Sequence, residues 1–211
     1  MKRRNASTLI QAGFTLTELL VVMAIIVALA GLLFPVISIA KRKAKEAKAR
    51  TEEQMIVNAI KAYLTEYGKL PVDDADQGIS NDKFYSNGSP SSSTPPAGYV
   101  TNIFNVLRAY AAGSNTNDVL NVKKMPFLDV PSKSLDENGY FLDPWGHPYF
   151  VKLDNDYNNV MEYYTAPATN IQAVAIVVSL GAVKNDTNNF WSSGAQCDPK
   201  SPDCDDIVSF R

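Results

Sequence analysis

Gly13-Phe14-Thr15-Leu16-Thr17-Glu18 stands immediately before an uncharged run that extends from Leu19 to Ala40. A short basic stretch, Lys2-Arg3-Arg4, precedes it. At about 1.5 Å per helical residue the uncharged run would be roughly 33 Å long, which matches a bilayer hydrocarbon core of about 30 Å. The sequence therefore predicts a membrane-spanning helix with one acidic residue, Glu18, at its beginning.

The residues around Gly13 resemble the cleavage and methylation motif of type IV prepilins and type II secretion pseudopilins. Gly13-Phe14, the basic stretch before it and Glu18 carry this resemblance, and Pro35 lies where many pilins have a helix proline. In that family prepilin peptidase cuts after the glycine on the cytoplasmic side, and the new N-terminal residue, here Phe14, is N-methylated. The resemblance implies a leader peptide at residues 1–13. A plain single-pass anchor or an uncleaved signal sequence is the alternative.

Glu18 is a charged residue at the start of a long apolar segment, and this position requires a physical explanation. A carboxylate inside a bilayer costs about 2.5 to 3.5 kcal/mol on insertion scales, so an unpaired one is unfavourable. Cleavage would create a cationic partner, the free amine of Phe14. In the family the amine of a neighbouring subunit pairs with this glutamate and sets the helix register, which implies that Glu18 is an assembly residue. The alternative is a glutamate hydrated by lipid headgroups.

Length, net charge and residue types limit the classes of function that we expect for this chain. The chain has 211 residues and a formal net charge of -2, and loss of Lys2, Arg3 and Arg4 with the leader would make it -5, so we expect no basic surface for nucleic acid. Residues 41–211 suffice for one globular domain. We expect no enzyme, because the sequence offers no convincing nucleophile and base, and His147 is the one histidine.

Two rules disagree about membrane topology. Six cations lie between Lys41 and Arg50 and three in the leader, so the positive-inside rule would put the C-terminal part in the cytoplasm. The resemblance implies the opposite: a single crossing of the inner membrane at residues 14–40, a cytoplasmic N-terminus and a periplasmic domain at residues 41–211. We follow the resemblance, because the peptidase acts at the cytoplasmic face and two cysteines suit an oxidising space.

A second helical pattern continues from the membrane run. Apolar residues recur at spacings of 4, 3 and 4 on one face, and a glycine follows them: Ile56, Ile60, Tyr63, Tyr67 and then Gly68. This predicts a nearly continuous helix from about Phe14 to Tyr67, whose second half packs on a sheet. A coiled coil is the alternative.

Residues 71–131 are rich in turn formers and are predicted to be a loop-rich insertion, with exposed loops at residues 72–76 and 86–96. A short helix is predicted inside it, docked by one face, with Thr101 or Asn102 as N-cap and Gly113 as its stop. That face consists of Ile103, Phe104, Leu107, Tyr110 and Ala111. The aspartates between Asp73 and Asp76 could bind a cation, although a solvated acidic loop is the favoured interpretation.

Asp143-Pro144-Trp145-Gly146 has the signature of a type I turn, in which the Asp143 carboxylate accepts backbone hydrogen bonds and Pro144 sets φ. The stretch from Asp143 to Tyr149 also resembles the turn before the sheet in the major pseudopilins of type II secretion. Tyr67-Gly68-Lys69-Leu70-Pro71 resembles the helix end of the same proteins. These two matches favour the pseudopilins within the wider family.

Strand patterns occupy the last third of the chain. Residues 149–153 and 160–165 are predicted to pair as a hairpin around the loop at residues 154–159. The apolar run from Ala173 to Leu180 is predicted to be the central strand, covered by the long helix, and residues 207–210 to be a last strand. The predicted fold class is α+β and pilin-like: a long N-terminal helix on a small antiparallel sheet, with a short second helix and long loops.

Ser179-Leu180-Gly181 and Asp206-Ile207 resemble the borders of the calcium-binding loop of major pseudopilins. The resemblance implies carboxylate ligands at Asp186, Asp205 and Asp206 and the backbone carbonyl of Leu180, and oxygen ligands suit calcium. Val183 departs from the family pattern, which has an aspartate near this place. Either Asp186 substitutes for that aspartate or the site is lost.

Cys197 and Cys204 are the two cysteines of the chain. In an oxidising compartment they are predicted to form a disulfide that closes a small loop. A zinc site would need more ligands than one histidine can add, and reactive thiols are the other alternative.

The resemblance implies a structural subunit of a type II secretion pseudopilus, which assembles from the inner membrane into a periplasmic filament that drives protein export. Its partners would be further copies of the chain, minor pseudopilins, the inner-membrane assembly platform and prepilin peptidase. One alternative is a type IV pilus subunit or minor pilin that serves adhesion, motility or DNA uptake. Another is a monomeric membrane-anchored binding domain.

Overall fold

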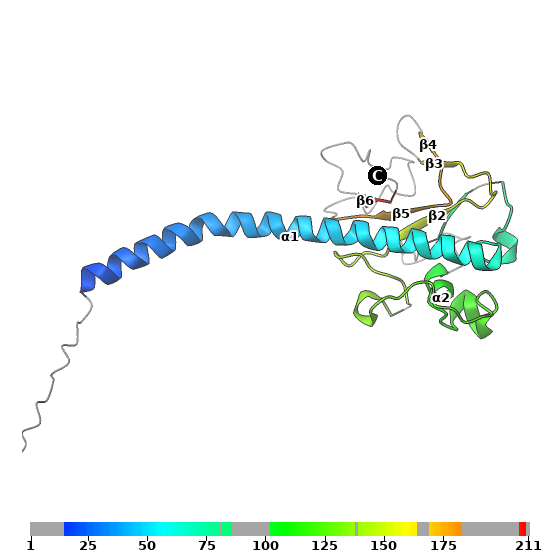
Figure 1. The fold of residues 1–211 in the computed structure, drawn as a ribbon, viewed down its shortest axis with the longest axis horizontal. Helices are drawn as coiled ribbons and strands as arrows, with labels where there is room; N and C mark the ends of the chain where they lie inside the picture. Colours follow the sequence, from blue (N-terminus) through cyan, green and yellow to red (C-terminus); the bar gives the residue numbers. More distant parts are fainter. Residues whose placement is uncertain are drawn as a thin grey trace, which may run out of the picture. The chain divides into compact units, whose positions relative to one another are not determined.

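The computed structural model describes residues 15–80, 82–85, 102–137, 139–163, 169–182 and 207–209. The chain divides into two compact units, Met1–Lys43 and Ala44–Arg211. Helix α1 (Leu16–Tyr67) begins in the first unit and ends in the second, and it is 52 residues long (Figure 1). The predicted long helix is confirmed.

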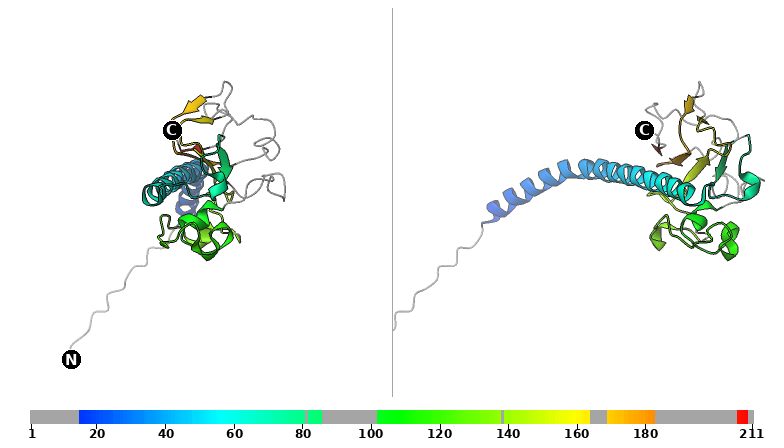
Figure 2. Two further views of the ribbon diagram at one scale, coloured as in Figure 1. Left: turned by 90° about the vertical axis from the view of Figure 1, so that its right-hand side faces the viewer. Right: turned by 45° about the vertical axis from the view of Figure 1, so that its right-hand side comes forward.

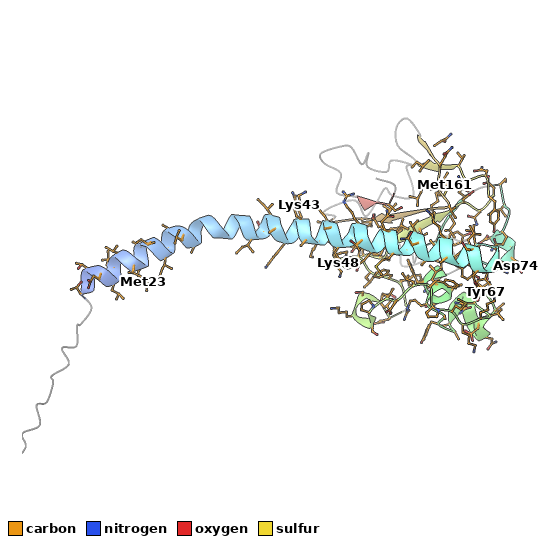
Figure 3. All side chains as sticks on the ribbon, viewed as in Figure 1. Met23, Lys43, Lys48, Tyr67, Asp74 and Met161 are labelled. Carbon is orange, nitrogen blue, oxygen red and sulfur yellow. The ribbon has the colours of Figure 1, made fainter. Side chains whose placement is uncertain are left out.

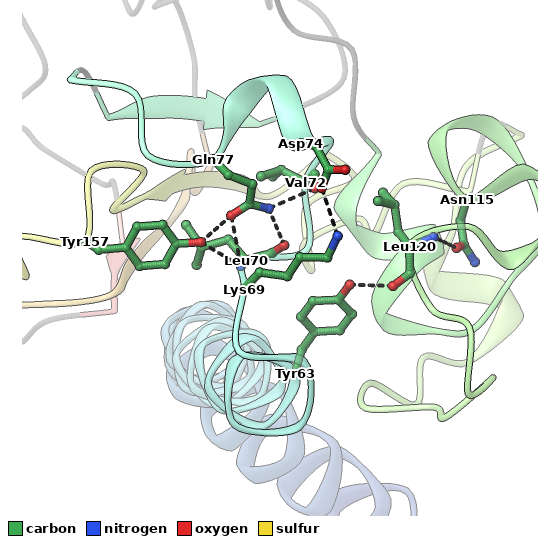
Figure 4. A network of polar contacts seen from close by, with 9 residues as sticks. All are labelled: Tyr63, Lys69, Leu70, Val72, Asp74, Gln77, Asn115, Leu120 and Tyr157. Atoms are coloured by element: carbon green, nitrogen blue, oxygen red, sulfur yellow. Dashed lines mark hydrogen bonds and ion pairs between the residues drawn. The ribbon is translucent and has the colours of Figure 1, made fainter.

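Helix α1 ends where the sequence predicts. Gly68 has a φ of +68°, the left-handed conformation that glycine adopts without a steric cost, and its N–H donates to the carbonyl of Leu64 at 2.8 Å. The segment that follows is fixed by Gln77, whose amide group donates to the carbonyls of Leu70 (2.8 Å) and Val72 (3.0 Å) (Figure 4). The hydroxyl of Tyr157 donates to the side-chain oxygen of Gln77.

Four strands form the main antiparallel sheet of the second unit, in the order β1-β2-β5-β6. These strands are β1 (Lys83–Tyr85), β2 (Phe150–Leu153), β5 (Ala175–Ser179) and β6 (Ile207–Val208). A separate two-stranded ribbon contains β3 (Met161–Tyr163) and β4 (Thr169–Ile171) (Figures 1 and 2).

The main hydrophobic core lies between the second half of α1 and one face of this sheet. Ile56, Ile60 and Tyr63 of α1 are fully buried there. They share a core with alternate residues of the central strands, Val151, Leu153, Ala175 and Val177. Tyr67 packs against the same core as a partly buried residue. The predicted apolar face of the helix and its packing on a sheet are therefore confirmed.

The opposite face of the sheet is also covered. Phe150, Ile176 and Val178 form a second buried cluster with Met161 and Leu180. Because β5 is buried on both faces, its side chains show no alternation of apolar and polar residues, which is why the sequence has an unbroken apolar run here. The prediction of a central strand is confirmed.

The predicted hairpin between residues 149–153 and 160–165 is wrong. Strand β2 pairs with β1 on one side and with β5 on the other, whereas β3 pairs with β4. The reason is that both hydrogen-bonding edges of β2 are already occupied. In the connecting loop, Tyr157 and Asn159 have positive φ angles of 59° and 58°, and the chain leaves the sheet there.

The insertion contributes more to the core than its composition indicates. Helix α2 (Ile103–Leu107) is capped by Asn102, whose side chain accepts from the N–H of Phe104 at 3.1 Å. It ends earlier than predicted, since Ala109 has a φ of 55°, and both Tyr110 (56% exposed) and Ala111 are exposed, which corrects the predicted face. All five residues of α2 are buried, so the helix does not dock by one face alone. Val72 is fully buried, so residues 72–76 are not wholly an exposed loop.

Three short 3-10 helices complete the described elements: η1 (Asp74–Asp76), η2 (Gly113–Asp118) and η3 (Ser132–Ser134). The end of the insertion is attached to α1 by the buried hydroxyl of Tyr63, which donates to the carbonyl of Leu120 at 2.6 Å (Figure 4). The loop predicted at residues 86–96 lies outside the described residues.

Candidate functional site

The first turn of α1 contains the predicted assembly residue Glu18. Its Oε2 accepts from the backbone N–H of Thr15 (2.8 Å) and from the Thr15 hydroxyl (2.7 Å). In return, Oγ1 of Thr15 accepts from the N–H of Glu18 at 3.2 Å. This is a capping box, in which the N-cap side chain and the glutamate three residues later satisfy each other's free backbone donors. The spacing Thr15-Leu16-Thr17-Glu18 signals it, and our reading of the sequence missed it.

Beyond this cap, the apolar side chains of α1 are exposed. Five consecutive residues are each about half exposed or more: Leu19, Leu20, Val21, Val22 and Met23. Figure 3 labels Met23 on this part of the helix. Five consecutive helical residues sample the whole circumference, because each is turned by about 100° from the last. Within the described residues, no helix combines the length and the apolar character that a membrane crossing requires. Gly13 and Phe14 lie outside the described residues.

The turn before β2 has the predicted geometry. Oδ1 of Asp143 accepts from the N–H groups of Trp145 and His147, both at 2.9 Å, and the N–H of Gly146 donates to the Asp143 carbonyl at 3.0 Å. The ammonium of Lys45 lies 5.7 Å from the centre of the Trp145 ring, which connects the turn to α1.

The Asp143 side chain is fully buried, which the turn signature did not predict. Its second oxygen, Oδ2, accepts from the hydroxyl of Ser179 at 2.7 Å and lies 3.8 Å from Nδ1 of His147. The carboxylate therefore joins the turn to the end of β5 as well as shaping the turn itself.

Two glutamates of α1 are buried near Asp143. Oε2 of Glu52 accepts from the hydroxyl of Tyr149 at 2.7 Å, and its Oε1 lies 3.5 Å from the ammonium of Lys48. Burial, together with this contact to Glu52, raises the pKa of Tyr149. Glu53 is 1% exposed, and neither of its carboxyl oxygens has a hydrogen-bond partner within the described residues.

Burial raises the pKa of Glu53 to about 8, and the proximity of Asp143 adds to the shift. The backbone of Ser179 and the guanidinium of Arg50 oppose it only in part. Glu53 therefore keeps its proton at neutral pH, because burial disfavours the ionised carboxylate by more than Ser179 and Arg50 stabilise it.

The predicted C-terminal calcium site is described only at its first border. Leu180 is buried, and the N–H of Gly181 donates to the hydroxyl of Ser179 at 3.2 Å. The other predicted ligands and the predicted disulfide lie outside the described residues: Asp186, Asp205, Asp206, Cys197 and Cys204.

A different set of carboxylates comes together in the part of the chain that the structure describes. Oxygens of Asp82, Asp154 and Asp156 all lie within 4.8 Å of one another. The predicted acidic segment from Asp73 to Asp76 is not part of this group, and Asp74 instead forms an ion pair with Lys69 at 2.9 Å. The set of three was not predicted from the sequence, because Asp82 is distant from the other two along the chain.

Comparison with known proteins addresses the N-terminal segment. The sequence profile of the prokaryotic N-terminal methylation motif matches residues 8–34. No curated protein and no solved structure matches the chain. The matched residues include the predicted cleavage site, the capping box and the exposed apolar part of α1. The motif therefore indicates a type IV pilin-like protein whose leader is processed by prepilin peptidase.

Proposed function

We propose that this chain is a structural subunit that polymerises through the first half of α1 into a helical filament of the type II secretion pseudopilus. The exposed apolar surface of α1 carries this proposal, since it continues around the whole helix between Leu19 and Met23. Soluble monomers rarely expose contiguous apolar patches larger than a few hundred Å². Packing against the same segment of neighbouring subunits would remove this surface from water. The subunit acts by assembly and not by catalysis.

Before assembly, this segment would anchor the subunit in the inner membrane. We place the crossing at residues 14–40, with the N-terminus in the cytoplasm and residues 41–211 in the periplasm. The absence of charged residues between Leu19 and Ala40 supports the crossing, and the position of the cleavage motif supports the orientation. The cations between Lys41 and Arg50 favour the opposite orientation under the positive-inside rule. Protease added to spheroplasts tests the orientation: it should digest residues 41–211 if they lie in the periplasm and leave them intact if they lie in the cytoplasm.

Glu18 has two roles in this proposal. In the structure it completes the capping box with Thr15, which requires only a hydrogen-bond acceptor. In the filament its charge would pair with the amine of Phe14 of a neighbouring subunit, which requires an anion. Glutamine can serve in a capping box but carries no charge, so one substitution separates the two roles.

The experiment compares Glu18→Gln with Glu137→Gln, which neutralises an exposed glutamate far along the chain. Both variants should be cleaved before Phe14, as N-terminal sequencing shows, and both should enter the membrane. Crosslinking in cells should give a ladder of oligomers for the wild type and for Glu137→Gln, but mainly monomers for Glu18→Gln. A normal ladder for Glu18→Gln would mean that Glu18 acts only as a helix cap.

The choice of the secretion pseudopilus rests on the turn at Asp143 and on Ser179-Leu180-Gly181. These two stretches resemble the major pseudopilins, and they are joined by the hydrogen bond between Ser179 and Asp143. Deletion of the gene should then stop protein export without loss of surface fibres. Immunogold-labelled fibres that extend from the cell would favour a type IV pilus subunit instead. Monomers in crosslinking, with export and fibres intact, would favour a membrane-anchored binding domain.

Two features of the C-terminal segment belong to the same proposal. We propose a calcium site formed by the Leu180 carbonyl and the carboxylates of Asp186, Asp205 and Asp206, and a disulfide between Cys197 and Cys204. The resemblance to major pseudopilins supports the first, and the proposed periplasmic location supports the second. Peptide mass mapping with and without reduction tests the disulfide.

A further inference from the structure

The sheet itself brings a third aspartate to the loop between β2 and β3. Strands β1 and β2 pair antiparallel with Lys83 opposite Leu153. Asp82 precedes Lys83 and Asp154 follows Leu153, so the register places the two aspartates at the same end of the pair. Asp156 follows in the loop, and oxygens of all three carboxylates lie within 4.8 Å of one another.

Asp154 is the central residue of this group, because its side chain is buried and only one of its two carboxylate oxygens accepts a hydrogen bond among the described residues. The residue is 3% exposed. Its Oδ2 accepts from the N–H of Asn159 at 2.8 Å, but Oδ1 is buried and has no hydrogen-bond partner within the described residues. A buried anionic oxygen without a partner costs free energy of folding. A cation beside Oδ1 would remove this cost.

The local charge suits a divalent cation. Oxygens of the three carboxylates lie within 4.8 Å of one another, so their negative charges repel. The ammonium of the buried Lys152, on the adjacent strand β2, offsets part of this negative charge. Three carboxylates and one ammonium leave a net charge of about -2, which a divalent cation neutralises.

The other hydrogen bonds of the loop do not use all the acceptor capacity of the three carboxylates. Asp82 accepts from the backbone N–H of Asn155 at 3.2 Å, which holds its carboxylate against the loop. Asp156 accepts from the backbone N–H of Asn158 (3.1 Å) and from the side-chain amide of Asn158 (2.7 Å). These donors orient the carboxylates, and each carboxylate retains further acceptor capacity for a metal.

The loop sequence supports the same ligand. Asp154-Asn155-Asp156-Tyr157-Asn158-Asn159 has oxygen side chains at its first, third and fifth positions, as an EF-hand calcium loop has. The fifth position differs in use, because the side-chain oxygen of Asn158 accepts from the N–H of Val160 at 2.6 Å. The sixth position of that loop is a glycine that makes a sharp turn, and here Asn159 has a left-handed φ of 58°. The EF-hand glutamate at the twelfth position is absent, since Thr165 stands there. Asp82 supplies a third carboxylate from another segment.

We propose that Asp82, Asp154 and Asp156 bind a calcium ion that connects the β2–β3 loop to the segment before β1. Calcium fits better than magnesium, because calcium accepts about six to eight oxygens in flexible geometry, whereas magnesium requires near-octahedral geometry. Strand β1 is three residues long and lies at the edge of the sheet, so the ion would hold it against β2. This site is separate from the C-terminal calcium site and does not depend on the proposed filament.

The experiment uses the full chain in mild detergent, stripped of metal with a chelator, and CaCl₂ as the probe. Thermal unfolding and calorimetric titration compare the wild type with Asp156→Asn, with Asp206→Asn in the C-terminal loop, and with Asp129→Asn, an exposed control of equal charge change. Calcium should raise the Tm of the wild type and of Asp129→Asn. Asp156→Asn should lose the affinity of this site by at least tenfold, whereas Asp206→Asn should retain it.

Asp154→Asn is a second variant that separates loss of calcium binding from loss of folding. Because this change removes repulsion among the carboxylates, the metal-free variant should be at least as stable as the metal-free wild type, yet it should not bind calcium at this site. Terbium gives a second measurement, since Tyr157 in the loop can sensitise its emission and Tyr157→Phe should weaken the signal. Calcium binding that Asp156→Asn preserves and Asp206→Asn abolishes would overturn the proposal, as would no calcium binding by the wild type.

Discussion

The hydroxyl of Ser179 donates to Oδ2 of Asp143 at 2.7 Å, within the buried interior of the second unit. This bond joins the end of β5 to the turn that precedes β2, although the two residues are 36 positions apart in the sequence. The Asp143 carboxylate also accepts from the N–H groups of Trp145 and His147. The same carboxylate therefore sets the shape of the turn and its position on the sheet.

Ser179→Ala should lower the free energy of unfolding by about 1 to 3 kcal/mol, because it leaves Oδ2 of Asp143 buried with one donor fewer. Urea unfolding of the full chain in detergent measures this change. Ser132→Ala is the matched control, since Ser132 is exposed in η3, and it should change the stability by less than about 0.5 kcal/mol. Equal stability of the two variants would contradict the role of this bond.

The raised pKa of Glu53 makes the stability of the folded protein depend on pH. Its pKa is raised to about 8 in the folded protein from an ordinary value of 4.5. Between these values the folded state keeps a proton that the unfolded state has released, so Glu53 makes stability fall as pH rises through this window. The slope from one proton is at most about 1.4 kcal/mol per pH unit.

Glu53→Gln should remove this contribution and make the protein more stable near pH 8 than the wild type. Unfolding measured at several pH values between the ordinary pKa of 4.5 and the folded-state pKa of about 8 gives the slope of stability against pH for each variant. Glu137→Gln should keep the wild-type slope, because Glu137 is exposed. Parallel curves for Glu53→Gln and the wild type would show that Glu53 does not titrate in this way.

Tyr63→Phe tests the attachment of the insertion to α1. The Tyr63 side chain is fully buried, and loss of its hydroxyl leaves the carbonyl of Leu120 without this donor. We expect a loss of about 1 to 2 kcal/mol in stability. Tyr110→Phe removes a hydroxyl from a side chain that is 56% exposed and should have little effect. Hydrogen exchange of the backbone near Leu120 should increase in Tyr63→Phe alone.

Gln77→Glu tests the segment that follows α1. The amide of Gln77 donates to the carbonyls of Leu70 and Val72 (Figure 4). A glutamate in its place has no N–H to donate, so its carboxylate oxygens would face these two carbonyl oxygens. The Tm should fall by several degrees, which corresponds to about 2 kcal/mol for a domain of this size. Gln77→Met, which keeps the volume but has no charge, should cost less. A smaller loss for Gln77→Glu than for Gln77→Met would contradict the donor role.

Local features of this protein were predictable because neighbouring residues produce them. Gly68 ends α1 by its own backbone freedom, and Asn102 caps α2 by reaching the second N–H beyond it. The turn at Asp143 forms within five residues for the same reason. The capping box of Thr15 and Glu18 belongs to this class as well, and attention to the spacing of threonine and glutamate would have found it.

Features that depend on distant residues were not predictable in this way. The sequence could not show that β2 pairs with β1 and β5, because a strand pattern gives the faces of a strand but not its neighbours. For the same reason the predicted hairpin was wrong. The prediction for Tyr110 was wrong for a different reason: α2 ends at Leu107 and Ala109 has a positive φ, which leaves Tyr110 on the surface.

The sequence by itself determined the long helix, its apolar first half with Glu18 at the start, and the motif that indicates a type IV pilin-like protein. These follow from periodicity, charge and short-range spacing, which act along the chain. Only the tertiary structure decided that the Glu53 carboxyl group is buried, with no hydrogen-bond partner for its oxygens among the described residues, and that Asp82 meets Asp154 and Asp156. Burial and convergence arise from packing between segments far apart in sequence, so no local pattern contains them.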